Sequence, residues 1–176
     1  PTPYLGYDIQ GPFPFQEIID ELMAKRVVGV ANGRCEFGPR ALGNRTLFGD
    51  PRDLKIKDKI NEIKGRESFR PFAPMILEED VPKYFNGGFF SPYMSCALQA
   101  TQEFKIKYPG VVHLDGTSRL QVVKHEPHKT LLQIWKEITK CPVLLNTSLN
   151  IKGEPIVNTK EDAKAFSKKT GVNVYS

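Results

Sequence analysis

The feature that most constrains the fold is a strongly amphipathic helix followed at once by an apolar strand. Between His128 and Lys140, apolar residues recur at the i, i+3, i+4, i+7 spacing of one helix face: Leu131, Ile134, Trp135 and Ile138. Pro142 ends this helical pattern directly before the apolar strand Val143–Leu145. This order of elements is typical of a sheet that helices cover.

Other segments follow the same two periodicities, but they alternate irregularly. Helices are predicted for Phe15–Arg26, Leu54–Ile63 and a segment that starts at Thr159, which Asp162 caps, and closes at Gly171. Strands are predicted for Val27–Val30, Ala73–Leu77, Tyr93–Leu98 and Ser118–Val123. Consecutive strands without a helix between them favour an α/β (α+β) fold with a mixed β-sheet flanked by helices, rather than a strictly alternating doubly wound fold.

The length and the proline pattern predict one folded domain with a short arm before it. The 176 residues lie in the ordinary range of a single domain. Four prolines and two glycines among residues 1–14 rule out regular helix there, so these residues are expected to form an extended arm or linker. Residues 15–176 are expected to form the domain itself.

Composition excludes several classes of protein. No apolar run is long enough to span a bilayer, and no secretory signal is visible, so a cytoplasmic location without a membrane is expected. The three cysteines and the three histidines lack the spacing of a disulfide framework or of a metal site, so no metal ligand is expected. A net charge of +5 favours an anionic partner, although charge alone does not distinguish a nucleotide from a nucleic acid.

The densest chemical signal is the segment Gly33–Arg45, with the sequence GRCEFGPRALGNR. Glycines let backbone amides approach a phosphate closely, and arginines offer planar, bidentate donors to its oxygens. The spacing matches neither a Walker loop nor a dinucleotide fingerprint. The alternative is a basic loop whose arginines pair with Glu36 and Asp50.

A second basic segment, Lys64–Pro74, follows the predicted helix Leu54–Ile63. Its prolines and phenylalanines make it stiffer and less polar than a solvated charge run, which favours a phosphate-holding role. Two weaker signals follow later in the chain. His113–Arg119 contains an Asp-Gly turn, which also fits a plain hairpin, and Asn146–Asn150 follows the apolar strand Val143–Leu145, where α/β sheets collect ligands but where a turn cap is equally expected.

Taken together, these segments resemble the C-terminal domain of the O-carbamoyltransferases, the family of antibiotic and nodulation-factor carbamoylating enzymes. The resemblance runs from about Tyr4 to Asp162. It is carried by the motifs EFGPRALG, DPR, RESFRPFAP, DGT and NTS at positions 36–43, 50–52, 66–74, 115–117 and 146–148. Leu149 departs from the phenylalanine that is usual in the family.

The resemblance implies a YrdC-like twisted mixed β-sheet flanked by helices, in which a KxR pair and an SxN pair serve the formation of acyl adenylates from ATP. In this sequence the pairs are Lys64 with Arg66 and Ser148 with Asn150. The implied catalytic residues are Lys64, Arg66, Arg119 and Ser148. The implied substrate- and nucleotide-binding residues are these four together with Arg40, Arg70, Asn146 and Asn150.

The resemblance also implies a reaction and its partners. Carbamoyl phosphate, ATP and Mg²⁺ are expected to yield carbamoyl adenylate, and an N-terminal actin-like domain, in cis or in trans, is expected to transfer the carbamoyl group to an acceptor hydroxyl. Two alternatives are a basic RNA-binding module and a docking domain without catalysis. RNA is the less favoured partner because the aromatic residues adjoin prolines instead of interleaving with basic residues as a stacking surface would.

Overall fold

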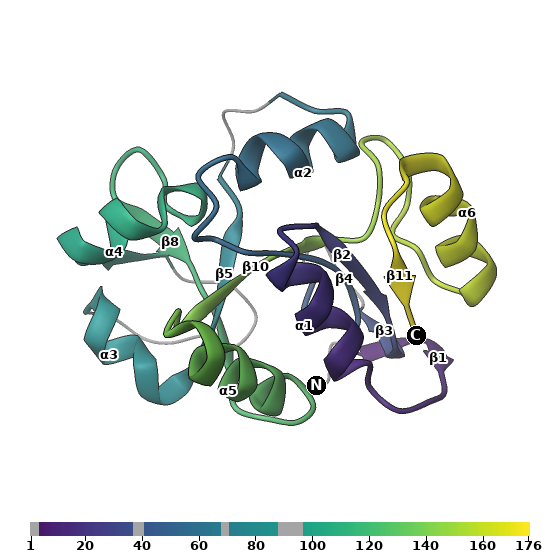
Figure 1. The fold of residues 1–176 in the computed structure, drawn as a ribbon, viewed down its shortest axis with the longest axis horizontal. Coiled ribbons are helices and arrows are strands. Elements are labelled where there is room, and N and C mark those ends of the chain that lie inside the picture. Colours follow the sequence, from purple (N-terminus) through teal and green to yellow (C-terminus); the bar gives the residue numbers. More distant parts are fainter. Residues whose placement is uncertain (1–3, 37–40, 68–70, 88–96) are drawn as a thin grey trace. The chain divides into compact units, whose positions relative to one another are not determined.

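The computed structural model describes residues 4–36, 41–67, 71–87 and 97–176 (Figure 1). By its contacts the chain divides into two compact units. The first contains residues 1–49, 58–67 and 146–176, and the second contains residues 50–57 and 68–145. Within the described residues, no helix combines the length and the apolar character that a bilayer crossing requires.

The first unit is built on a mixed sheet. Its strand order is β11 (Val174–Tyr175), β2 (Val28–Ala31), β4 (Arg45–Gly49), and the next strand in the order is β10 (Val143–Ser148), of which residues 146–148 belong to this unit. β11 runs parallel to β2, whereas β2 and β4 are antiparallel, in the register Gly29 to Leu47. A parallel pair and an antiparallel pair in one sheet confirm the predicted mixed topology.

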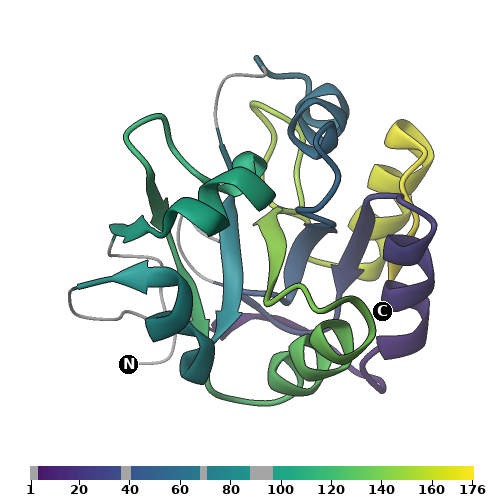
Figure 2. The same cartoon turned by 60° about the vertical axis from the view of Figure 1, so that its left-hand side comes forward.

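Helices of the first unit pack along this sheet. α1 (Phe15–Met23) lies beside β2, and α6 (Lys160–Thr170) lies beside β11, as both views show (Figures 1 and 2). α6 begins as the sequence predicts, because the Thr159 side chain accepts from the Asp162 backbone N–H while the Asp162 carboxylate accepts from the Thr159 N–H. It ends at Gly171, whose φ of 75° suits glycine.

Residues 1–14 were expected to form an extended arm or linker. Tyr4–Ile9 are extended, but they form strand β1, which pairs antiparallel with β3 (Gly33–Glu36) in the same unit. β3 also lies inside the segment expected to be a glycine-rich loop. The short strands β1, β3, β4 and β11 were not predicted, because each is too brief or too polar to show an alternating pattern. The boundary between residues 14 and 15 stays a prediction.

The second unit holds two groups of strands. β5 (Ala73–Leu77) pairs in parallel with β9 (Gln121–Val123), and its other neighbour in the strand order is β10. A three-stranded sheet has the order β6 (Phe85–Asn86), β7 (Ala97–Ala100), β8 (Thr117–Arg119). The strand expected over Ser118–Val123 is therefore two strands broken at Leu120, which join different sheets. Of the strand expected over Tyr93–Leu98, residues 93–96 lie outside the described residues.

Helices complete the second unit. They are α3 (Val81–Tyr84), α4 (Gln102–Lys107) and α5 (His128–Thr139). α5 confirms the predicted amphipathic helix, since Leu131 and Trp135 are fully buried, but Ile138, expected on the same face, is 51% exposed near the end of the helix. The Trp135 indole Nε1 donates to the Val143 carbonyl at 2.9 Å. The Arg52 guanidinium lies 5.1 Å from the Trp135 ring centroid and is paired with Asp50 at 2.8 Å, so this arginine belongs to the packing of the unit.

Helix α2 (Ile56–Lys64) confirms the helix predicted over Leu54–Ile63, but its buried face differs from the expected one. In the sequence, Ile56, Ile60 and Ile63 are spaced so that they are expected to share one apolar face of this helix. Ile56 and Ile60 are buried as expected, but the stripe continues through Asn61 and Lys64, which are 1% and 3% exposed, and Ile63 is only half-buried. The i, i+4, i+8 spacing from Ile56 leads to Lys64, so the helix turns a charged residue inward.

Arg45 organises the first unit from inside. Its side chain has no solvent exposure, and its guanidinium donates only to backbone carbonyls, those of Tyr7, Asn32, Gly33, Asn44 and Asn158, at 2.7–3.2 Å. Burial lowers its pKa below the usual value. The alternative in which arginines of this segment pair with Glu36 does not hold for Arg45, because Glu36 Oε1 instead accepts the backbone N–H groups of Leu42, Asn44 and Arg45.

Replacing Arg45 by methionine is expected to lower the free energy of unfolding by about 3–4 kcal/mol, because the change leaves several buried carbonyls without donors. Urea denaturation measures the loss. Arg34→Met is the matched control, since Arg34 is exposed and its ion pair with Asp8 is long, at 4.0 Å. Its free energy of unfolding is expected to change by no more than about 0.5 kcal/mol. Equal losses in the two variants would contradict this account of Arg45.

Candidate functional site

The described residues of the first unit bring Lys64 together with both members of the predicted SxN pair. The Lys64 Nζ donates to the Ser148 carbonyl at 2.6 Å, to the Ser148 Oγ at 3.2 Å and to the Asn150 Oδ1 at 3.0 Å. Residues more than 80 positions apart in the sequence therefore form one cluster. We refer to Lys64, Ser148 and Asn150 as the lysine cluster.

Two further bonds hold the lysine cluster rigid. The Lys64 carbonyl accepts the backbone N–H of Lys152 at 2.8 Å, which ties the end of α2 to the loop after β10. The Asn150 Nδ2 donates to the Glu154 carbonyl at 2.9 Å and thereby fixes the side-chain amide. The cluster is thus positioned by the end of a helix, the end of a strand and the loop that follows the strand.

The charge of Lys64 is the unusual property of this cluster. Its side chain is buried, and all three of its acceptors are neutral oxygens. Among the described residues, no carboxylate lies within ion-pair distance of its ammonium group. Burial, and secondarily the positive charge of Arg66, lower the pKa of Lys64 from 10.5 to about 7. A buried cation without a counter-charge is a site that an anion can neutralise.

Ser148 is engaged on both sides by the cluster. Its hydroxyl accepts from Lys64 and donates to the Asn150 Oδ1 at 2.6 Å. No histidine or carboxylate is bonded to this hydroxyl in the described part of the chain. Its proton points to the neutral Asn150 Oδ1 and not to Lys64, which donates to it, so no base is placed to make it a nucleophile. The geometry suits a group that orients and hydrogen-bonds.

Arg66 lies directly after α2, half-buried, in the same unit. Its Nε donates to the Asn61 Oδ1 at 2.7 Å, and its backbone N–H donates to the Asn61 carbonyl at 3.0 Å. Asn61 therefore positions Arg66. Sequence reasoning missed Asn61, although a polar residue three positions before Lys64 on the buried face of α2 was a usable signal.

The remaining predicted site residues are Asn146, Arg119, Arg40 and Arg70. Asn146 is buried in β10, where its Nδ2 donates to the Ala41 carbonyl at 3.0 Å, which is a structural role within the first unit. Arg119 ends β8 in the second unit and has an exposed side chain. Arg40 and Arg70 lie outside the described residues. The roles assigned to these four residues stay predictions.

The Asp115-Gly116 segment forms the turn that the sequence predicts. Gly116 has a φ of 83°, and the Asp115 carboxylate accepts from the backbone N–H and the hydroxyl of Thr117 at 3.0 and 2.7 Å. These bonds lower the pKa of Asp115. The Asp115 carboxylate and its two Thr117 donors all belong to the turn and the start of β8, so local structure accounts for these hydrogen bonds.

Neither thiol in the described residues has the properties of a nucleophile. Cys35 and Cys141 are both buried and unpaired, and burial raises the pKa of each, to about 11 for Cys141. Within the described ranges, no three His, Cys, Asp or Glu side chains gather closely enough to hold a metal ion. The lysine cluster is therefore the candidate site.

The chain is similar to several curated proteins. The family model of the carbamoyltransferase C-terminus matches residues 19–176. An uncharacterized protein of Methanocaldococcus jannaschii is 43% identical over 152 residues, which are 84% of this chain and 25% of that protein. Nodulation protein NolO of Bradyrhizobium diazoefficiens is 42% identical over 144 residues, 78% of this chain and 26% of that protein. The chain thus spans about a quarter of the length of these relatives.

Two solved structures share the fold at lower identity. Full-length HypF, in a phosphate- and nucleotide-bound form, superposes with a TM-score of 0.69 and 20% identity, over 95% of this chain and 25% of HypF. A variant of P. abyssi Sua5 superposes with a TM-score of 0.62 and 15% identity, over 97% of this chain and 52% of Sua5. These likenesses confirm the predicted YrdC-like fold. By the family match and the identity to its relatives, the chain belongs to the carbamoyltransferase C-terminus family.

Proposed function

We propose that this chain binds ATP and carbamoyl phosphate and forms carbamoyl adenylate, the activated half of an O-carbamoylation reaction. The observation that carries the proposal is the buried, uncompensated ammonium group of Lys64, held by Ser148 and Asn150. Membership in the carbamoyltransferase C-terminus family supports it. The phosphate- and nucleotide-bound form in which HypF was solved is consistent with it.

The lysine cluster has the chemistry that an anion needs. Phosphate oxygens would supply the negative charge that the neutral acceptors of Lys64 do not. Arg66, whose Nε donates to Asn61, adds a guanidinium group, a planar donor whose geometry suits phosphate oxygens. A point charge beside a fork suits a polyphosphate better than it suits a single carboxylate.

The proposed step has a balanced course. Water cleaves carbamoyl phosphate to carbamate and inorganic phosphate. A carbamate oxygen then forms a bond to the α-phosphorus of ATP, the bond from that phosphorus to the bridging oxygen breaks, and pyrophosphate leaves. Two anions must approach each other in this step, and like unit charges about 4 Å apart repel by about 4 kcal/mol at intermediate effective dielectric.

The basic residues offset that repulsion in the proposed mechanism. Lys64 and Arg66 hold the phosphates of ATP, with Arg40 and Arg70 as further phosphate ligands and Arg119 as a ligand of the carbamoyl group or the phosphates. Ser148 and Asn150 keep the Lys64 ammonium in place, and the Ser148 hydroxyl donates to a phosphate oxygen when its bond to the Asn150 Oδ1 opens. Asn146 supports the same strand end from the buried side.

Mg²⁺ would share the charge of the leaving pyrophosphate. In the described residues the lysine cluster contains no carboxylate, so its own donors suit phosphate oxygens, whereas a hard cation would reach the site on the phosphates. The acceptor hydroxyl and an actin-like domain that presents it, in cis or in trans, complete the proposed reaction. The chain spans about a quarter of its relatives, which leaves length for such a domain in those proteins.

Exchange of labelled pyrophosphate into ATP, dependent on carbamoyl phosphate, tests the proposal. The wild-type chain is expected to catalyse this exchange with Mg²⁺ present. Lys64→Met is expected to lower the rate about 100-fold or more, because it removes a preorganised cation while it keeps the apolar stem buried. Arg119→Ala is expected to lower the rate as well.

Lys168→Met is the matched control, since Lys168 is exposed on α6 and lies outside the lysine cluster. It should exchange at the wild-type rate. Calorimetry on the same proteins identifies the alternatives. A wild-type chain that binds neither ATP nor pyrophosphate, but binds RNA with a steep salt dependence, would replace the enzyme proposal with a nucleic-acid-binding one.

Protonation of Lys64 should be linked to ligand binding. Its pKa of about 7 leaves it largely neutral at pH 8, and a bound polyphosphate raises that pKa by favouring the charged form. Binding of ATP at pH 8 is therefore expected to take up close to one proton, or about 0.5–0.9 per site. Since uptake accompanies binding, the affinity for ATP should fall as the pH rises from about 7 to 9.

Calorimetric titration in HEPES and in Tris measures this uptake, because the two buffers differ in their enthalpy of ionisation. Lys64→Arg is the control variant: its side chain stays charged across this range, so uptake from this position should vanish while binding persists. Equal uptake in the wild type and in Lys64→Arg would show that another group titrates.

A further inference from the structure

The turn that ends α2 is a Schellman motif, and it contains the KxR pair. The backbone N–H of Arg66 donates to the Asn61 carbonyl at 3.0 Å, and the backbone N–H of Gly65 donates to the Glu62 carbonyl at 3.1 Å. Gly65 has a φ of 68°, the left-handed conformation that this motif requires. The chain therefore folds back at Gly65 and brings Arg66 onto Asn61, a residue of the buried face of α2.

The two residues that meet in this motif are polar, whereas an apolar contact is usual between these positions. The Arg66 Nε donates to the Asn61 Oδ1 at 2.7 Å. Asn61 is 1% exposed, and its Nδ2 has no hydrogen-bond partner in the part of the chain that the structure describes. A buried donor without an acceptor destabilises a protein, so stability does not explain why an amide occupies this position.

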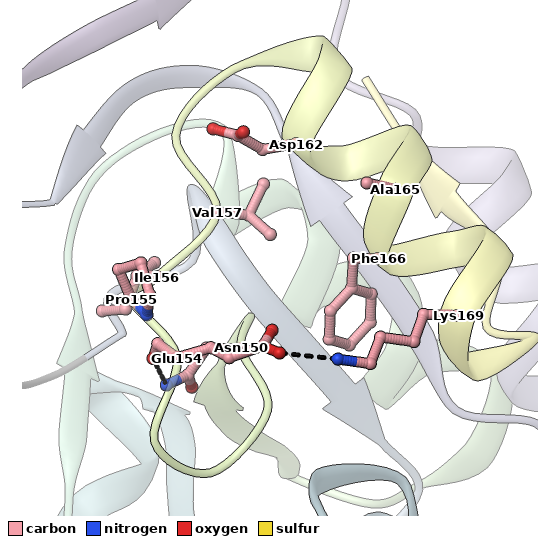
Figure 3. A pocket seen from close by; sticks show the side chains of 9 residues that line it. All are labelled: Asn150, Glu154, Pro155, Ile156, Val157, Asp162, Ala165, Phe166 and Lys169. Carbon is pink, nitrogen blue, oxygen red and sulfur yellow. Dashed lines mark hydrogen bonds and ion pairs between the residues drawn. The ribbon is translucent and has the colours of Figure 1, made fainter.

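Asn150, the amide of the lysine cluster, differs because both ends of its side chain are used. Its Oδ1 accepts from Lys64, and its Nδ2 donates to the Glu154 carbonyl (Figure 3). The ammonium group of Lys169 in the same view is likewise paired, with the Glu154 carboxylate at 2.6 Å (Figure 3). Among these side-chain donors, the Asn61 Nδ2 alone has no acceptor within the described ranges.

The surroundings of the Asn61 amide are positively charged. Lys64 follows Asn61 by three positions on the buried face of α2, and Arg66 contacts the amide directly. The charge of Arg66 adds to the larger effect of burial in lowering the pKa of Lys64, so the two cations are close enough to interact. An anionic oxygen is therefore the acceptor that suits the unused donor.

We propose that Asn61 is a further binding residue of the anion site: its Oδ1 positions the Arg66 guanidinium, and its Nδ2 donates to a phosphate oxygen of the ligand that Lys64 and Arg66 hold. The inference rests on the proposed function, in which that ligand is ATP, and adds a neutral donor to the two cations. Arg66 is half-buried, so its side chain can shift as it takes up the ligand and open the amide to a phosphate oxygen.

A double-mutant cycle separates the two roles of Asn61. Asn61→Leu removes both ends of the amide and supplies the apolar side chain that is usual in the motif, so it should unfold at no lower temperature than the wild type. Calorimetric titration of the full chain with ATP measures binding. Asn61→Leu is expected to lower the affinity about tenfold or more, and still about fivefold when it is added to Arg66→Met.

Inorganic triphosphate distinguishes a phosphate contact from any other contact with ATP. The same losses of affinity are expected for this probe, because it presents phosphate oxygens alone. A loss for ATP without a loss for inorganic triphosphate would overturn the assignment of Nδ2 to a phosphate oxygen. Asn61→Ala, which adds no atoms, repeats the titrations if thermal unfolding shows that leucine is not accommodated.

Asn86→Leu is the matched control, because it makes the same substitution at an exposed asparagine of β6 outside the lysine cluster. It should bind both ligands as the wild type does. A change of less than about twofold when Asn61→Leu is added to Arg66→Met would overturn the direct contact, since Asn61 would then act through Arg66 alone. Failure of the wild type to bind ATP would instead reject the proposed function itself.

Discussion

The burial of one ammonium group among neutral oxygens is the constraint on which the candidate site depends. Lys64 sits at the end of α2, where its own carbonyl accepts the Lys152 N–H and its Nζ reaches Ser148 and Asn150. These bonds fix the end of a helix to the end of a strand. They do not neutralise the charge, which is why the pKa falls to about 7 and why an anion is the ligand that the cluster lacks. The Lys64 side chain therefore both fixes the end of α2 and gives the lysine cluster its affinity for anions.

A comparison with Arg45 shows why burial of a cation alone does not make a site. Arg45 is less exposed to solvent than Lys64, yet its guanidinium donates to five backbone carbonyls. Its donors are used by the fold, and removing them from those carbonyls would cost the protein stability. Lys64 has a compact ammonium group, and two of its three acceptors are side-chain oxygens, those of Ser148 and Asn150, which can rearrange when a phosphate binds. In this protein the planar guanidinium of Arg45 stabilises the fold, whereas the compact ammonium group of Lys64 suits a bound ligand.

The long helices and the link between the KxR and SxN pairs could be predicted from the sequence. Features that depend on contacts between distant residues could not. Helices α1, α5 and α6 have enough residues for a 3.6-residue period to be visible, and Ala73–Leu77 is a short apolar run that ends before Glu78. β4 carries Arg45 inward and β3 carries Glu36 inward, so no apolar pattern marks them as strands. Leu120 separates two strands that join different sheets, which only the pairing reveals. For the site, the motifs identified Lys64, Ser148 and Asn150, but Asn61 acts through Arg66, and a positioning residue leaves no motif of its own.

The inner face of α2 explains why this helix departs from its predicted stripe. Ile56 and Ile60 supply the apolar burial that holds the helix in place, and the same face then continues into Asn61 and Lys64. An apolar residue at position 64 would pack there without the desolvation of a charge, which for a lowered pKa of this size costs a few kcal/mol, on the order of 1.4 kcal/mol per pKa unit. A sequence that retains lysine at such a position gives up stability locally. Departures of this kind from the rules of packing are expected where a protein binds its ligand, so the charged end of α2 is itself an argument that the lysine cluster is functional.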